Sequence, residues 1–104
     1  MENIEKLLKA IVDDYARFSE NPERSKMFSR NMQLRRGRKY YVIILEDGRT
    51  WGFVQRYNDT KFRIGDILKA NNSATPARNI ACGNVILEQF DQVCWWGPNS
   101  NVLA

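Results

Sequence analysis

Histidine is absent from all 104 residues of the chain. Nucleophile systems of the Ser/His and Cys/His kind need imidazole as a base, and common zinc sites need imidazole or several thiolates. The two cysteines, Cys82 and Cys94, are too few for a disulfide framework and are typical of buried thiols. We therefore expect a protein that is not an enzyme, with no catalytic residue, no metal site and no cofactor.

Long apolar runs are also missing, since none approaches the roughly 20 residues that cross a bilayer. The start, MENIEKLLK, has neither the basic region nor the apolar stretch of a signal peptide. A content of 43% apolar residues is nevertheless enough for one core in a chain of this length. The sequence thus predicts a single intracellular domain that does not enter a membrane.

Charge of one sign is missing from two segments. Residues 24–45 contain seven bases and no acid, whereas residues 79–104 contain two acids and no Lys or Arg. Residues 1–23 carry a net charge of −3 and residues 46–78 a net charge of +2, within a total of +4. Positive charge is therefore concentrated in the middle of the chain, which makes that region the first candidate for contact with an anionic partner.

Two helices are predicted at the N-terminal end. The first covers Ile4 to Ser19, because its apolar residues recur at the spacing of one helical face. Asn21-Pro22-Glu23 then supplies a cap, a proline suited to the first helical position and an acid for the first turn. This predicts a second, shorter helix from Pro22 to about Asn31 that buries Met27 and Phe28.

From residue 40 the apolar pattern changes to that of strands. Tyr40 to Leu45 is apolar on both faces, and Asp47-Gly48 suits a type I′ hairpin turn. The return strand, residues 50–57, is expected to place Trp51, Phe53 and Tyr57 on one face. Further strands are predicted at residues 62–68, 84–87 and 93–96, the last of them stopped by Gly97-Pro98.

These elements predict an α+β fold in which an N-terminal helix pair packs on a small antiparallel sheet of four to five strands. A small SH3-like or OB-like barrel is the alternative architecture. Residues 1–104 would form one domain, with a helical arm (1–36), an antiparallel β region (37–97) and a loose tail (98–104).

A basic run joins the predicted helices to the sheet. Binding of phosphates needs Lys or Arg side chains on one surface, with aromatic rings nearby for stacking on bases. The candidate residues for binding a partner or nucleic acid are Arg30, Arg35, Arg36, Arg38 and Lys39, with Tyr41 and Trp51 as the stacking rings. The alternative is a solvated connection whose charges discourage edge-to-edge pairing of strands.

Trp95 and Trp96 form a second candidate surface. Adjacent residues of a strand face opposite sides, so the two indoles cannot enter one core layer. Either the strand is covered on both faces and both rings are structural, or one ring is exposed as an anchor for a protein partner.

Asp66, Glu88 and Cys82 are the remaining residues with reactive groups that a cleft could use. Nothing in their spacing brings the two carboxylates together, and Cys82 near Arg78 lacks a histidine partner. Positions in turns or on the solvent face, and a buried thiol, are the simpler interpretations.

The segment from Gly37 to Val85 resembles a group of small proteins of tailed phages and large DNA viruses. The matching elements are Gly37-Arg38-Lys39-Tyr40, Phe53-Val54, Gly65-Asp66-Ile67-Leu68-Lys69-Ala70, Pro76-Ala77-Arg78 and Gly83-Asn84. The resemblance implies a viral origin and a compact β domain, and it implies no reaction. There are two departures: Cys82 stands where the group tends to have Arg before Gly-Asn, and the preceding loop, ANNSATPARN, lacks the Trp common in the group.

The expected function is that of a non-catalytic viral accessory protein that binds a host or viral macromolecule through the basic and aromatic surfaces. A nucleic-acid-binding domain is the alternative, and a minor virion component is the second alternative. A host or viral protein is the expected partner, with nucleic acid and a homodimer left open. The expected location is the host cytoplasm or the virion.

Overall fold

The computed structural model describes residues 3–78 and 80–98. Two helices come first, α1 (Ile4–Ser19) and α2 (Pro22–Asn31). A four-stranded antiparallel sheet follows in the spatial order β1 (Gln33–Arg36), β2 (Tyr40–Ile44), β3 (Thr50–Gln55) and β4 (Ile67–Lys69). The C-terminal hairpin pairs β5 (Val93–Cys94) with β6 (Gly97–Pro98). The predicted α+β class is therefore confirmed, and the described sheet is open, with β1 and β4 as its edges.

Both helices have the predicted bounds. In α2 the Asn21 side chain accepts hydrogen bonds from the backbone N–H groups of Glu23 and Arg24, which caps the first turn. Phe28 is buried as predicted, but Met27 is 48% exposed. Consecutive helical residues are about 100° apart, so α2, packed on α1 along one side, cannot bury both side chains.

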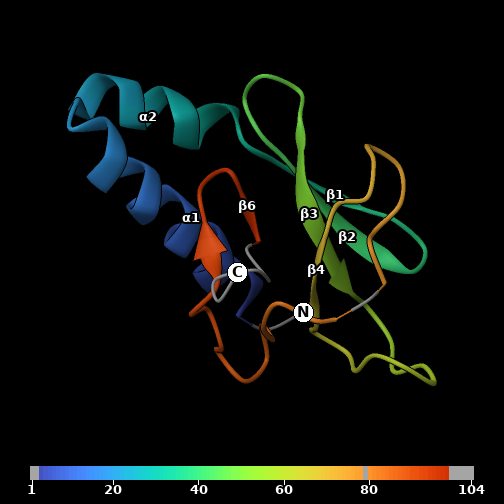
Figure 1. Cartoon of the computed structure of the whole chain (residues 1–104). Helices are drawn as coiled ribbons and strands as arrows, with labels where there is room; N and C mark the ends of the chain where they lie inside the picture. Colours follow the sequence, from blue (N-terminus) through green and yellow to red (C-terminus); the bar gives the residue numbers. More distant parts are fainter. Residues whose placement is uncertain (1–2, 79, 99–104) are drawn as a thin grey trace.

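α1 lies on one side of the sheet with α2 packed against it, and the β5–β6 hairpin lies between α1 and the sheet (Figure 1). Leu7 and Ile11 of α1 pack in one buried cluster with Ile43, Trp51 and other apolar residues of the strands. This cluster is the main core, because it joins both helices, the sheet and the C-terminal segment.

A β-bulge separates two rings that the sequence predicts on one face. Gly52 pairs with Ile43 and Thr50 pairs with Ile44, so Trp51 has no partner of its own on β2. Trp51 consequently packs on the helix side, whereas Phe53 belongs to a second cluster on the opposite face with Phe62. The predicted shared face is wrong, because the extra residue reverses the alternation.

The region predicted as a helical arm ends earlier than residue 36. Gln33–Arg36 is the edge strand β1, which pairs with residues 41–44 and is exposed along its length. Because both faces of this strand are exposed to solvent, its sequence lacks the alternation of apolar and polar residues by which strands are predicted. The following hairpin turn also differs from the prediction: positive φ occurs at Gly48 and not at Asp47, so the turn is not type I′.

The later strands are shorter than predicted. The strand expected at 62–68 is reduced to β4, and residues 84–87 form a turn with isolated bridges at Asn84. Gly97 and Pro98, expected to end a strand, form β6. Residues 99–104 of the predicted tail lie outside the described residues. None of the described helices is long and apolar enough to cross a membrane.

Candidate functional site

Two connections lie together at one end of the sheet. β1 ends and β2 begins at the turn of residues 37–39, and β3 ends and β4 begins at the connection of residues 56–66. The backbone N–H of Arg56 donates to the carbonyl of Lys39 over 2.9 Å, which joins the two connections directly. The acidic turn at Glu46 and Asp47 is at the other end of β2 and β3.

This end of the sheet holds much of the positive charge of the molecule. Residues 36–39 and 56–66 contain six bases against two acids, a net charge of +4, which equals the formal charge of the entire chain. The net charge of all the other residues together is therefore zero. We use "basic end" for these six cationic residues, which are Arg36, Arg38, Lys39, Arg56, Lys61 and Arg63.

The two acids of these segments are held by hydrogen bonds within the protein. The Asp59 carboxylate accepts from the N–H groups of Phe62 and Lys61, both over 2.8 Å, and from the guanidinium of Arg78 over 2.6 Å. The backbone N–H groups of Phe62 and Lys61, followed by Arg78, hold the pKa of Asp59 well below its usual range. The buried Asp66 accepts from the N–H of Arg63 and from the Asn84 amide. Both carboxylates thus organise turns.

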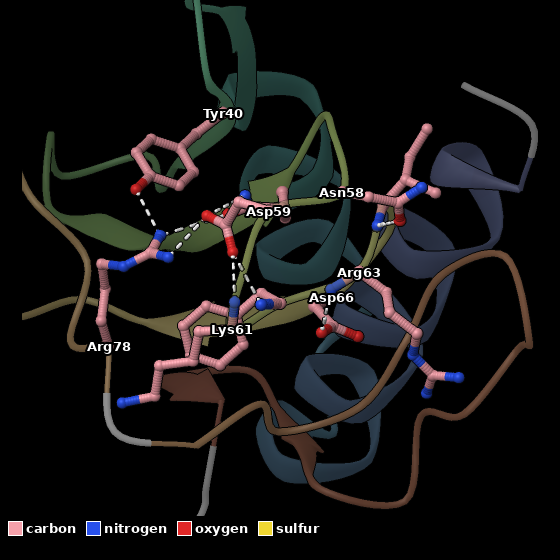
Figure 2. Close-up of polar contacts among 10 residues, drawn as sticks. Tyr40, Asn58, Asp59, Lys61, Arg63, Asp66 and Arg78 are labelled. Carbon is pink, nitrogen blue, oxygen red and sulfur yellow. Dashed lines mark hydrogen bonds and ion pairs between the residues drawn. The ribbon is translucent and has the colours of Figure 1, made fainter.

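Arg78 joins the segment of residues 70–78 to the basic end. Its guanidinium donates to the Tyr40 hydroxyl over 2.8 Å and to Asp59, and it lies 4.7 Å from the centroid of the Phe62 ring. The hydrogen bond with Asp59 raises the pKa of Arg78. Figure 2 shows this network, with the charged ends of Lys61 and Arg63 pointing away from it.

The cations of the basic end are not neutralised by neighbouring acids. Within residues 3–78 and 80–98, none of the six takes part in an ion pair, whereas Lys6, Lys9, Arg17, Arg24, Arg49 and Arg78 each face a carboxylate. Unpaired charges that share one end of a small domain create a field that attracts anions. This end is therefore the strongest candidate for contact with a partner.

The structure divides the basic run that the sequence singles out. Arg36, Arg38 and Lys39 lie at the basic end, but Arg35 pairs with Val42 and projects from the face opposite to Arg36. Arg30 lies in α2, whose end leads into β1 beside Ile44, at the other end of the sheet. The run as a whole is therefore not one continuous surface.

The predicted aromatic candidates have different environments. Trp51 is 1% exposed and its indole N–H donates to the carbonyl of Cys94, so it cannot stack on a base from this position. Tyr41 is half-buried against the main core, and the guanidinium of Arg56 lies 5.4 Å from its centroid.

Trp95 and Trp96 lie in the turn between β5 and β6 and not in the strand predicted at residues 93–96, and one of the two rings is exposed. Trp95 packs edge-on against Tyr15 with centroids 5.1 Å apart, and Trp96 is 51% exposed. Phe18, also exposed, lies 4.9 Å from the Trp95 ring. These rings form an aromatic surface remote in sequence from the basic end.

A hollow of about 690 Å³ adjoins the basic end, with Lys61 and Arg63 in its wall. Asp66 and Cys82 also line it, but Glu88 does not, because its carboxylate pairs with Lys6 of α1 over 3.0 Å. The described part of the chain has no group of three Cys, Asp or Glu residues able to hold a metal ion. The wall of the hollow is therefore mixed, since the acids Asp66 and Asp91 line it together with the two cations and several apolar residues.

Four residues at this end are absent from the sequence-based candidates: Arg56, Tyr57, Lys61 and Arg63. The bases on either side of Phe62 are only a weak indication of a binding surface in the sequence. The negative charges of Asp59 and Asp66 also lower the net charge of this segment. Only the hydrogen bonds that engage those two acids show that the cations remain unpaired. Comparison with protein-family models, curated proteins and solved structures finds no match for this chain.

Proposed function

We propose that this domain acts without catalysis, by binding an anionic macromolecule at the basic end. The observation that supports the proposal is that six cations without acidic partners gather around two connected turns. The resemblance of residues 37–85 to small viral proteins further suggests that the macromolecule is one met in an infected cell, and that the protein is a viral accessory factor.

The construction of the site favours binding over turnover. The carboxylates of Asp59 and Asp66 are each engaged by at least two donors of the protein, which holds them in structural roles. Five of the six cations, by contrast, are exposed to solvent, and the sixth, Arg56, donates to backbone carbonyls of the β1–β2 turn. Charges held in this way attract a polyanion at long range and give an association that weakens as salt is added.

Binding of the protein to fluorescent heparin at rising salt concentrations tests this proposal. The variant Arg38→Gln/Lys39→Gln removes two charges from the basic end, and its matched control, Lys26→Gln/Arg30→Gln, removes two charges from α2. We expect the first variant to bind about thirtyfold more weakly at low salt, with a shallower salt dependence, because two surface cations at about 1 kcal/mol each contribute about 2 kcal/mol.

The control should stay within about twofold of the natural protein. Equal losses in the two variants would mean that net charge alone attracts heparin, and the basic end would then have no special role. Absence of heparin binding by the natural protein at low salt would remove the proposal altogether.

A further inference from the structure

Tyr57 presents an exposed aromatic ring within the basic end. It stands at the start of the β3–β4 connection, directly after Arg56, and is 53% exposed. The exposed part of this ring offers apolar area and a π face close to several cations. A partner that contacts this position therefore meets the ring and the charges together.

The ring is held in place by its neighbour. The guanidinium carbon of Arg56 lies 5.3 Å from the centroid of Tyr57 and 5.4 Å from the centroid of Tyr41. A cation at this distance over a ring is attracted by the negative face of the π system. One side of Tyr57 is thus occupied by Arg56, and the exposed area of the residue remains for contact with a partner.

Arg56 is itself fixed to the β1–β2 turn. Its guanidinium donates to the carbonyls of Gly37 and Arg38, the second over 3.1 Å, and its backbone N–H donates to Lys39. The ring of Tyr57 therefore keeps a set position relative to the cations of that turn. A contact surface ordered before binding loses less conformational entropy when a partner arrives.

We propose that the basic end binds single-stranded nucleic acid, with one base stacked on the exposed side of Tyr57 and adjacent phosphates held by Arg38 and Lys39. The proposal rests on the proposed function and names its ligand. Single strands expose the flat faces of their bases, so an aromatic ring next to cations can use both parts of a nucleotide. In a duplex, those faces are covered by neighbouring base pairs, and an acidic protein would use the charges but not the ring.

The test compares three ligands by fluorescence anisotropy: oligo-dT of about twelve nucleotides, a duplex of the same length, and heparin. The variant Tyr57→Leu removes the ring and keeps every charge, and Tyr57→Phe is its matched control. Because Tyr57 is exposed, both variants should fold, which circular dichroism checks. We expect Tyr57→Leu to bind oligo-dT between about fivefold and a hundredfold more weakly, with heparin binding unchanged and with Tyr57→Phe within about twofold of the natural protein.

The other outcomes separate the two proposals. If Tyr57→Leu binds oligo-dT as tightly as the natural protein while heparin is bound, the stacking role is wrong and the anion-binding function stands. If the duplex is preferred over oligo-dT, the assignment to single strands is overturned. If the natural protein binds none of the three ligands, the proposed function fails as well.

Discussion

At the scale of single residues, Asp59 shows how one side chain organises the candidate site. Its carboxylate accepts from the backbone of the turn that presents Lys61 and also from Arg78, which joins residues 70–78 to the sheet. The acid neutralises Arg78 and leaves the cations of the basic end unpaired. A residue counted as negative charge in the sequence thus supports a positive surface in the structure.

Asp59→Asn should lower the thermal stability near neutral pH. Because the folded pKa of Asp59 lies below its unfolded value of about 3.9, the carboxylate stabilises the fold fully above that value. This stabilisation is lost as the pH falls through the folded pKa. The difference in Tm between the natural protein and the variant should therefore be largest near about pH 7 and narrow progressively below about pH 4.

The control for this pH series is Asp47→Asn, since that carboxylate lies 4.0 Å from Arg49 and takes part in a more exposed turn. The Asp47→Asn variant removes the same charge without breaking a contact between distant segments. A difference in Tm for Asp59→Asn that stays constant from neutral to acid pH would contradict the assigned role of the charge.

At the scale of elements, the C-terminal hairpin depends on the sheet for its position. The buried Trp51 indole donates to the carbonyl of Cys94 in β5 over 2.8 Å, and Asp14 of α1 accepts from the N–H of Trp95 over 2.9 Å. Strands of two residues are too short to be stable alone. The hairpin is therefore held by side chains from β3 and α1.

Trp51→Phe should destabilise the protein by about 2 to 4 kcal/mol, because the carbonyl of Cys94 loses its donor and the smaller ring leaves a cavity in the main core. Urea denaturation measures the loss, and hydrogen exchange should show faster opening of β5 and β6. Trp96→Phe, at an exposed position, should change stability by less than about 0.5 kcal/mol. Equal stabilities of the two variants would show that the indole hydrogen bond does not anchor the hairpin.

At the scale of the whole molecule, charge and core are distributed differently. Among the described residues, six of the ten cations without an ion pair lie at one end of the sheet. The main core, in contrast, runs continuously from the helices through the strands to the C-terminal segment. Trp51 of the sheet and Trp95 beside α1 pack in or against this same core. The helices and the sheet should therefore not unfold independently.

We expect a single unfolding transition in urea. Tryptophan fluorescence, which reports mainly on the packing around Trp51 and Trp95, should give the same midpoint as far-UV circular dichroism, which reports on helices and strands. A fluorescence midpoint that precedes loss of the helical signal would show that the helix pair is a separate unit, contrary to the shared core.

Sequence alone determined the elements that are periodic over many residues. The apolar stripe of α1, the cap of α2 at Asn21 and the strand that begins at residue 40 need only local spacing and side-chain chemistry. The bounds of both helices and the start of this strand were predictable for that reason, although the strand ends at Ile44 and not at Leu45. Tertiary structure decided what depends on pairing between distant segments: the strand β1, the bulge that buries Trp51, and the meeting of the two turns at the basic end. Backbone hydrogen bonds across strands leave no periodic trace in side chains that stay exposed, so the neighbours of Arg56 and Tyr57 appear only once the chain has folded.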